Sequence, residues 1–307
     1  MASLIDLKTN EIIYLKVKHL FGRLQSAVDN QVEGRQVSRV HASIEWTGSQ
    51  WDFCDHSRNG SWLSNRQISG GQRTALKNGD TIGFEEGDQN VFKVLELDPP
   101  WTLLIDRKRQ QKPMKVDPFH VLPSEENPLV SLYYKDQNWF KEKDGVSQLV
   151  ETGNHIDVDG QSWLFFNPMT SELTQIAVKG QNPIDNISFE FYPSSDLESI
   201  EIVGQLGGQR IEFGVRNHNY LLLLLAKAKQ TDLENQLPPH QQGWVDVSVL
   251  ASQMNLDPAH LNIQVYRARK HIMSCLEVSA SPEQIITRRS GEMRLAFNKF
   301  KICGTVP

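Results

Sequence analysis

The sequence predicts a multidomain protein with an N-terminal all-β sandwich, a small β-rich middle unit and a C-terminal α+β domain. The chain has 307 residues, which is too many for one ordinary core. Alternating apolar and polar residues over 11–97 are typical of strands, whereas helical spacing first occurs after residue 217. Pro99 and Pro100, followed by the polar stretch 106–113, mark a break between two regions. We therefore expect domains at residues 1–98, 99–185 and 186–307.

Short strands separated by polar turns account for the first region. The strand segments EIIYLKV, HASIEW, QWDFCD and TIGFEE each place their apolar residues on one face. The turn clusters between them include TGSQ, SRNGS, SGGQ and KNGD. This spacing favours an antiparallel sandwich.

The middle region returns to strand character in the segments PLVSLYY, HIDVDG and SWLFF. Two of its passages echo the first region. VSLYYKDQNWFK is similar to ASIEWTGSQWDF, and VETGNHIDV is similar to LKNGDTIGF. Either the middle region is a degenerate second copy of the first, or it is an unrelated small β unit.

Strands, helices and a hairpin follow one another in the last region. The strands are ISFEFY, SIEIVG and RIEFGV. We expect one helix with Asn217 as its N-cap and a second that starts after Asp246. A third is expected with Asp257 as N-cap and Pro258 in the first helical position. The segment IITRRSGEMRLAF, turning at residues 290–292, predicts the hairpin.

Composition bounds the location and the class of the protein. The longest apolar run, YLLLLLA, is far shorter than the roughly 18 residues of a membrane span, and the N-terminus lacks a secretory pattern. Three distant cysteines offer neither a disulfide framework nor a zinc site, so we expect a cytoplasmic protein without metal or cofactor. No catalytic motif occurs, which predicts a binding protein and not an enzyme.

Charge is distributed unevenly along the chain. Residues 240–307 carry eight Lys or Arg against five Asp or Glu, although the whole chain has a net charge of −5. An acidic body with a basic end predicts different partners for the two halves. Chance scatter explains a difference of this size equally well.

Several short motifs stand at strand ends in the first region. They are Gly22-Arg23, Ser38-Arg39-Val40-His41, the turn Ser57-Arg58-Asn59-Gly60 and the later LKNGDTIGF. Occurring in this order between strands, they resemble the forkhead-associated (FHA) domain over roughly residues 11–97, under a third of the chain. A middle region that copied the first would then be a degenerate FHA-like unit.

The resemblance implies that loops at one end of the sandwich bind a phosphothreonine peptide. A phosphate monoester carries about −1.5 to −2 charges and accepts hydrogen bonds from Arg forks, hydroxyls and backbone N–H groups. It further implies that Asn59 bonds the peptide backbone and that His41 braces the Ser38 loop, while glycines permit tight turns. The expected phosphopeptide-binding residues are Arg23, Ser38, Arg39, Ser57, Arg58 and Asn59, and the expected loop-shaping residues are Gly22, His41 and Gly60.

The last region resembles the OmpR/PhoB-type winged helix in the order of its elements. In the third helix, four apolar residues recur on one face and are expected to pack inward: Leu261, Val265, Ala268 and Ile272. The resemblance implies that another face of this helix enters the major groove of DNA and that the hairpin wing meets phosphate or the minor groove. The expected DNA-binding residues are His260, Gln264, Arg267, Lys270, His271, Arg288 and Arg289.

Two features depart from that family's pattern. The basic cluster is short, and the loop QTDLENQLPPHQQG between the first two helices is long. Winged helices also bind proteins, so an adaptor without DNA binding remains as an alternative.

Together these observations predict a cytoplasmic bacterial signalling protein that couples phosphothreonine recognition to transcription. An upstream Ser/Thr kinase would phosphorylate a partner or a segment of this protein. Capture of that phosphothreonine would change the oligomeric state, with a homodimer on DNA, or free the winged helix. The competing hypothesis is an FHA adaptor whose winged helix binds protein.

Overall fold

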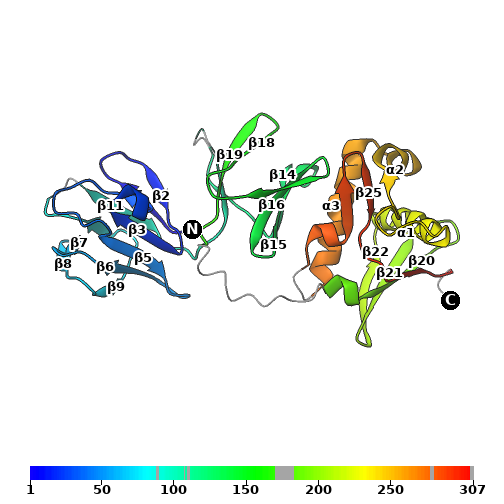
Figure 1. The fold of residues 1–307 in the computed structure, drawn as a ribbon, viewed down its shortest axis with the longest axis horizontal. Coiled ribbons are helices and arrows are strands. Elements are labelled where there is room, and N and C mark those ends of the chain that lie inside the picture. The colour runs from blue at the N-terminus through cyan, green and yellow to red at the C-terminus, as the bar shows by residue number, and fades with distance from the viewer. Residues whose placement is uncertain (88–89, 107, 109–110, 170–182, 277–279, 305–307) are drawn as a thin grey trace. The chain divides into compact units, whose positions relative to one another are not determined.

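The computed structural model describes residues 1–87, 90–106, 108, 111–169, 183–276 and 280–304 (Figure 1). Among these residues the chain forms two compact units. The first contains residues 1–103 and 166–169, and the second contains 104–165 and 183–304. No helix of the described part is both long and apolar enough to cross a bilayer.

The first unit is a sandwich of two sheets around one apolar core. Apolar side chains of both sheets meet in this core, among them Leu4, Phe92, Phe21 and Phe53. One sheet has the order β2-β1-β11-β10-β7-β8 and the other β4-β3-β5-β6-β9, in which only β3 and β4 pair in parallel. The strands are β1 Ser3–Asp6, β2 Ile12–Tyr14, β3 Lys18–Gly22, β4 Asn30–Gln31, β5 Ala42–Trp46, β6 Trp51–Asp55, β7 Ser61–Leu63, β8 Arg66–Ile68, β9 Arg73–Ala75, β10 Thr81–Gly83 and β11 Val91–Glu96. The prediction of an N-terminal all-β sandwich is confirmed.

The middle region forms a smaller two-sheet body within the second unit. Its sheets have the orders β13-β12-β19-β18 and β14-β15-β16-β17. Apolar residues between 104 and 165 form a separate core. The strands are β12 Leu103–Asp106, β13 Met114–Lys115, β14 Phe119–Ser124, β15 Asn127–Lys135, β16 Asn138–Lys143, β17 Val146–Val150, β18 His155–Val158 and β19 Gln161–Phe166.

This strand order repeats that of the first sandwich. The hairpin β15–β16 takes the place of β5–β6, and the series β13-β12-β19-β18 takes the place of β2-β1-β11-β10. The similar sequence passages fall on these corresponding strands. The topology therefore favours the degenerate-copy alternative over an unrelated β unit.

The middle sandwich has shorter loops than the first sandwich at the corresponding positions. Strands β14 and β15 are joined by Glu125 and Glu126 alone, whereas residues 32–41 lie between β4 and β5. Strands β16 and β17 are joined by Asp144 and Gly145. These short acidic turns have no basic residue with which to bind a phosphate.

The last region packs three helices and a hairpin against a four-stranded sheet around its own core. The sheet order is β22-β21-β20-β26, and a small sheet β23-β25-β24 contains the hairpin. The elements are β20 Ser188–Pro193, β21 Ile200–Leu206, β22 Gln209–Val215, α1 Asn219–Glu234, β23 Val245–Asp246, α2 Val247–Gln253, α3 Pro258–Cys275, β24 Ile286–Arg289, β25 Glu292–Leu295 and β26 Phe300–Ile302. Short 3-10 turns cover 25–27, 183–186 and 282–284.

Two of the three predicted helix starts are confirmed. Asp246 accepts a hydrogen bond from the Ser248 N–H, and Asp257 accepts one from the His260 N–H, with Pro258 in the first turn of α3. The prediction of Asn217 as a cap was wrong, because α1 begins at Asn219 after His218. The Asn219 N–H donates to the Arg216 carbonyl, so a turn occupies the residues before the helix.

Candidate functional site

Three loops of the first sandwich bring most of the predicted phosphopeptide residues together. They join β3 to β4, β4 to β5 and β6 to β7. The Arg23 N–H donates to the Ser38 carbonyl at 2.9 Å, and the Leu24 N–H donates to the Arg39 carbonyl at 3.1 Å. Residues far apart in sequence are thus held side by side, with Arg23 beside Ser38 and Arg39.

Two glycines permit the close approach of these backbones. A Cβ on Gly22 would lie 2.3 Å from the Arg39 carbonyl oxygen, which is far inside van der Waals contact. Gly60 has a φ of +82°, and a Cβ there would lie 2.7 Å from the Ile68 carbonyl oxygen. Both predicted loop-shaping glycines therefore occupy positions where a side chain does not fit.

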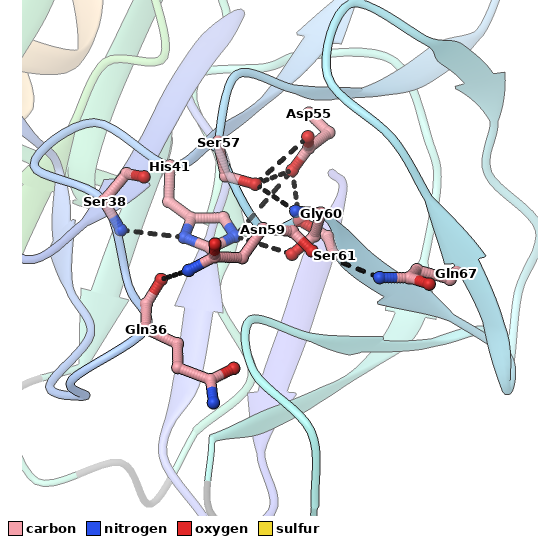
Figure 2. A network of polar contacts seen from close by, with 9 residues as sticks. All are labelled: Gln36, Ser38, His41, Asp55, Ser57, Asn59, Gly60, Ser61 and Gln67. Carbon is pink, nitrogen blue, oxygen red and sulfur yellow. Dashed lines mark hydrogen bonds and ion pairs between the residues drawn. The ribbon is translucent and has the colours of Figure 1, made fainter.

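His41 joins the β4–β5 loop to the β6–β7 loop through its ring, as Figure 2 shows. The side chain is 0% exposed. Its Nδ1 accepts from the Ser38 N–H at 3.0 Å, and its Nε2 lies 3.3 Å from the Gly60 carbonyl oxygen. Burial lowers the pKa of His41, so the ring is neutral with its proton on Nε2, donating to Gly60. A single imidazole therefore sets the spacing of Ser38 and the 57–60 turn.

A buried carboxylate accepts hydrogen bonds from the β6–β7 loop (Figure 2). Asp55 is 0% exposed and accepts hydrogen bonds from the hydroxyls of Ser57, at 2.9 Å, and Ser61, at 2.6 Å. The Ser57 hydroxyl also accepts from the Gly60 N–H at 2.8 Å. In this structure Ser57 organises the turn, and its contact with a phosphate stays a prediction.

Asp55 and Ser61 are site residues that the sequence did not predict. Their signal was present, because Asp55 follows Trp51 and Phe53 at a spacing of two and so points to the buried face. A carboxylate at a buried strand position needs hydrogen-bond donors nearby. The neighbouring Ser57 and Ser61 were the obvious candidates.

Asn59 lies at the exposed tip of the same turn and links it to its neighbours (Figure 2). Its side-chain amide donates to the Gln36 carbonyl at 3.1 Å, and its own carbonyl accepts from the Gln67 amide at 3.1 Å. These two bonds fix the tip against the loop before β5 and against β8. The protein alone thus fixes the orientation of the Asn59 side chain.

Three of the predicted arginines lie on these same loops. Arg23, Arg39 and Arg58 are all exposed, and no carboxylate of the described part of the chain forms an ion pair with them. Guanidinium groups bind phosphate through paired charge-assisted hydrogen bonds. Three unpaired cations beside rigid loops that carry hydroxyl and amide groups can bind a doubly charged oxyanion.

The predicted DNA-binding residues lie on α3 and the β24–β25 hairpin, with differing exposure. The four predicted inward residues of α3 are all buried in the core of the last region, which confirms that face. His260, Arg267 and Lys270 are exposed, while Gln264 and His271 are half-buried. The exposed Arg289 guanidinium lies 4.0 Å from the centre of the Trp244 ring.

Arg288 does not occupy the exposed position that was expected. Burial is the main cause that lowers its pKa, and the charges of Arg269, Glu142 and Asp144 act on it. A Cβ on Gly145, in the β16–β17 turn, would lie 2.6 Å from the Arg289 carbonyl oxygen. The middle sandwich therefore covers the Arg288 side of this strand while Arg289 stays exposed, and Arg288 is corrected to a half-buried residue.

A second face of α3, also unexpected, packs against the middle sandwich. Arg269 is 1% exposed and donates to both carboxylate oxygens of Glu142, at 3.0 and 3.2 Å. The Tyr266 ring packs against Phe119, with ring centres 5.4 Å apart. Lys270, predicted to contact DNA, forms an ion pair with Glu125.

The edge of this contact involves the 282–284 turn. Glu283 pairs with Lys135 and accepts a hydrogen bond from the Tyr133 hydroxyl at 2.8 Å. We name the contacts that Arg269, Tyr266, Lys270 and Glu283 make with the middle sandwich the α3 interface. Its partners lie more than a hundred residues away in sequence, so no local pattern could have shown it.

Comparison with known proteins identifies the first sandwich. Residues 19–85 match the FHA domain family, so the N-terminal region contains an FHA domain. No curated protein sequence matches the chain. The match does not extend to the last region, for which the resemblance to OmpR/PhoB-type winged helices stays a prediction.

Solved structures are similar over the same third of the chain. EmbR of Mycobacterium tuberculosis, in complex with a low-affinity phosphopeptide, is 26% identical with a TM-score of 0.28, over 32% of this chain and 25% of EmbR. The FHA domain of an Arabidopsis thaliana hypothetical protein is 19% identical with a TM-score of 0.29, over 32% of this chain and 87% of that one. The FHA domain of the CT664 protein from Chlamydia trachomatis is 17% identical with a TM-score of 0.27, over 31% and 96%. This chain thus spans a quarter of the length of EmbR.

Proposed function

We propose that the FHA domain of this chain binds a peptide that carries phosphothreonine. The observation that carries the proposal is the joining of Arg23, Ser38 and Asn59 by the His41 and Asp55 networks. Arg23, Arg39 and Arg58 supply positive charge, and the Ser38 hydroxyl supplies a donor. Asn59 bonds the peptide backbone. Loops fixed before binding lose less conformational entropy when the ligand arrives.

Titration of a phosphothreonine peptide library against the purified full chain tests this proposal. We expect micromolar dissociation constants, about −8 kcal/mol, and no measurable binding of the same peptides with plain threonine. Arg23→Ala should remove most of the affinity, because charge-assisted bonds dominate such sites. Arg73→Ala is the matched control, since Arg73 is an exposed arginine of the same sandwich that pairs with Glu45. Equal binding of phosphorylated and plain peptides would rule the proposal out.

We further propose that the last region is a winged helix that binds DNA, making the chain a cytoplasmic bacterial transcription regulator and not an enzyme. The order of its elements and the exposure of His260, Arg267 and Arg289 support this proposal. A Ser/Thr kinase acts upstream, and two chains bind one operator because a homodimer multiplies weak contacts.

The α3 interface supports a mechanism that couples phosphothreonine binding to DNA binding. While the middle sandwich covers Arg269, Tyr266 and Arg288, that side of the proposed wing strand is closed to DNA, and Arg289 stays exposed. In the proposed function, phosphothreonine capture by the FHA domain frees this surface. A conformational change of this kind needs a ligand that binds the open state more tightly than the closed one.

Electrophoretic mobility of genomic fragments at several salt concentrations separates the regulator from the FHA adaptor. A regulator that neutralises about six phosphates loses roughly three decades of affinity between 50 and 200 mM salt. Sequence-preferring shifts that disappear in the variant Gln264→Ala/Arg267→Ala support the regulator. Non-specific smearing that is the same in wild type and variant supports the adaptor.

A further inference from the structure

A pocket with an excess of positive charge lies in the second unit, apart from the FHA loops. Its volume is about 480 Å³. The turn between β22 and α1 contributes one wall, α3 contributes another, and Glu125 stands at the edge. We name it the basic pocket and define it by the residues that carry the argument: Arg216, His218, Gln264, Arg267, Lys270 and His271.

Its charge is not balanced by the described residues. Lys270 pairs with Glu125, which is the one carboxylate that lines the pocket. Arg216 and Arg267 are exposed, and neither forms an ion pair with any carboxylate in the part of the chain that the structure describes. Two guanidinium groups therefore face one concave surface without a counter-ion from the protein.

The excess of positive charge also affects two histidines of the pocket, His218 and His271. The Nε2 of His218 lies 3.1 Å from the Nδ1 of His271, so these rings share one hydrogen bond. Burial, His271, Arg216 and Arg267 together lower the pKa of His218 to about 4. Burial and Arg216 lower the pKa of His271. An oxyanion bound between the arginines would oppose this field and favour protonation of the ring.

Two further features suit an anionic ligand. The side-chain oxygen of Gln264 is buried and has no hydrogen-bond partner among the described residues. The two ends of such an amide can exchange by rotation, which would direct N–H donors to the same place. The positive end of α1, a helix of 16 residues, begins directly after His218.

We propose that the basic pocket binds a phosphate-class oxyanion. The proposal rests on the two arginines without ion pairs, on the hydrogen-bonded histidines and on the Gln264 side-chain amide, whose oxygen has no hydrogen-bond partner among the described residues. Arg216 and Arg267 bind the oxyanion through their guanidinium forks, and His271 and Gln264 donate to its remaining oxygens. The oxyanion is either a free phosphate compound or a phosphate of the DNA backbone, since both present the same group. Arg216 and His218 lie outside the face of α3 expected to enter the major groove, so this site extends beyond the proposed DNA contact.

Histidine-selective NMR of the full chain in the Arg23→Ala background tests the site, because that change disables the FHA loops. Inorganic phosphate is added at constant ionic strength, with chloride as the balancing anion. We expect the His218 and His271 ring signals to shift while the His41 signal stays in place. Arg216→Ala should weaken this response at least tenfold, and Arg210→Ala, a matched exposed arginine of β22, should leave it unchanged.

Two results of this NMR experiment would contradict the proposal. No phosphate-dependent shift of His218 and His271, or a shift that survives Arg216→Ala, overturns the proposal. Arg216→Gln, which keeps a long polar side chain, repeats the test if the alanine variant does not fold. A short DNA duplex added in place of phosphate identifies the source: a response to phosphate without a response to the duplex indicates a free phosphate compound, and a response to both ligands indicates the DNA backbone. Because the FHA loops are already disabled, failure here leaves the phosphothreonine proposal untouched.

Discussion

Single residues set the geometry of the FHA loops. His41 and Asp55 have no exposed surface, yet they determine the positions of half-buried Ser38 and exposed Asn59. Each buried polar group is fully engaged, because an unpaired one would be costly in a low dielectric. The chemistry at the tips thus depends on residues that a ligand never touches.

His41→Ala should destabilise the first sandwich by about 2–4 kcal/mol, because it removes two hydrogen bonds and leaves a cavity. The pKa of His41 is lowered in the fold, so its contribution is present above the unfolded value of about 6.5 and is lost as pH falls through the lower folded value. Urea denaturation between pH 5 and 8 measures this. The variant should lose less stability on acidification than wild type.

His155→Ala, at an exposed histidine of β18, serves as the control for that measurement. It should change the free energy of unfolding by less than about 0.5 kcal/mol. Identical pH profiles for wild type and His41→Ala would show that the ring is not held neutral. Stability is the readout because the phosphate group of a ligand titrates in the same range.

The packing of helix α1 depends on a buried cation. Lys229 is 3% exposed, and its ammonium donates to the carbonyls of Leu295, at 3.1 Å, and Phe297, at 2.8 Å. Gly243, at a φ of +73°, lies against its side chain, where a Cβ would approach to 2.9 Å. Burial and Arg294 lower the pKa of Lys229 to about 8. The helix is thereby tied to the end of β25 and to the segment that follows it.

Lys229→Met should alter how stability depends on alkaline pH. A lysine with a lowered folded pKa contributes stability that is fully present above about 10.5 and is lost as pH falls through 8. Wild type should therefore gain up to about 3 kcal/mol relative to the variant between pH 7 and 10.5. Denaturation over that range provides the measurement, with exposed Lys227→Met as control. If the free energy of unfolding depended on pH in the same way for wild type and Lys229→Met, the Lys229 ammonium would not be buried as a charged group.

At the scale of the molecule, two sandwiches with corresponding strand orders present different surfaces. Where the FHA domain has long arginine-bearing loops, the middle sandwich has short acidic turns, and Glu125 and Asp144 in those turns lie beside Lys270 and Arg288. The buried pair of Arg269 and Glu142 anchors this contact. Its orientation is well specified because both terminal guanidinium nitrogens of Arg269 donate to a carboxylate oxygen of Glu142.

Glu142→Gln should cost about 3–5 kcal/mol in the stability of the second unit, because Arg269 would remain buried without its counter-charge. Glu142→Leu combined with Arg269→Met should restore most of that loss. A double-mutant cycle by chemical denaturation measures the coupling. Glu212→Gln, in an exposed pair with Arg210, is the control and should cost less than about 1 kcal/mol. Additive single effects would mean that the two side chains do not interact.

The parts of the fold that depend on neighbouring residues could be predicted from the sequence. Asp257 and Pro258 predicted the start of α3, and the alternation before the 57–60 turn predicted β6, because caps and periodicity act within a few residues. Asn217 was wrongly predicted as the cap, although asparagine is a residue type that often caps helices. A turn closed by the hydrogen bond from the Asn219 N–H to the Arg216 carbonyl contains Asn217, so the helix begins only after it. The motif order from Gly22 to Gly60 predicted the FHA domain that the family comparison supports.

What the sequence determined by itself was the order of elements and the residue types at the loop tips, since both follow from short-range spacing. Only the tertiary structure decided which of those residues meet. Asp55 gained its role from hydroxyls that the folded turn directs toward it, and Arg269 pairs with a carboxylate 127 residues away. The physical reason is that burial and ion pairing depend on distances in space, and the chain sets these only when its sheets and helices pack.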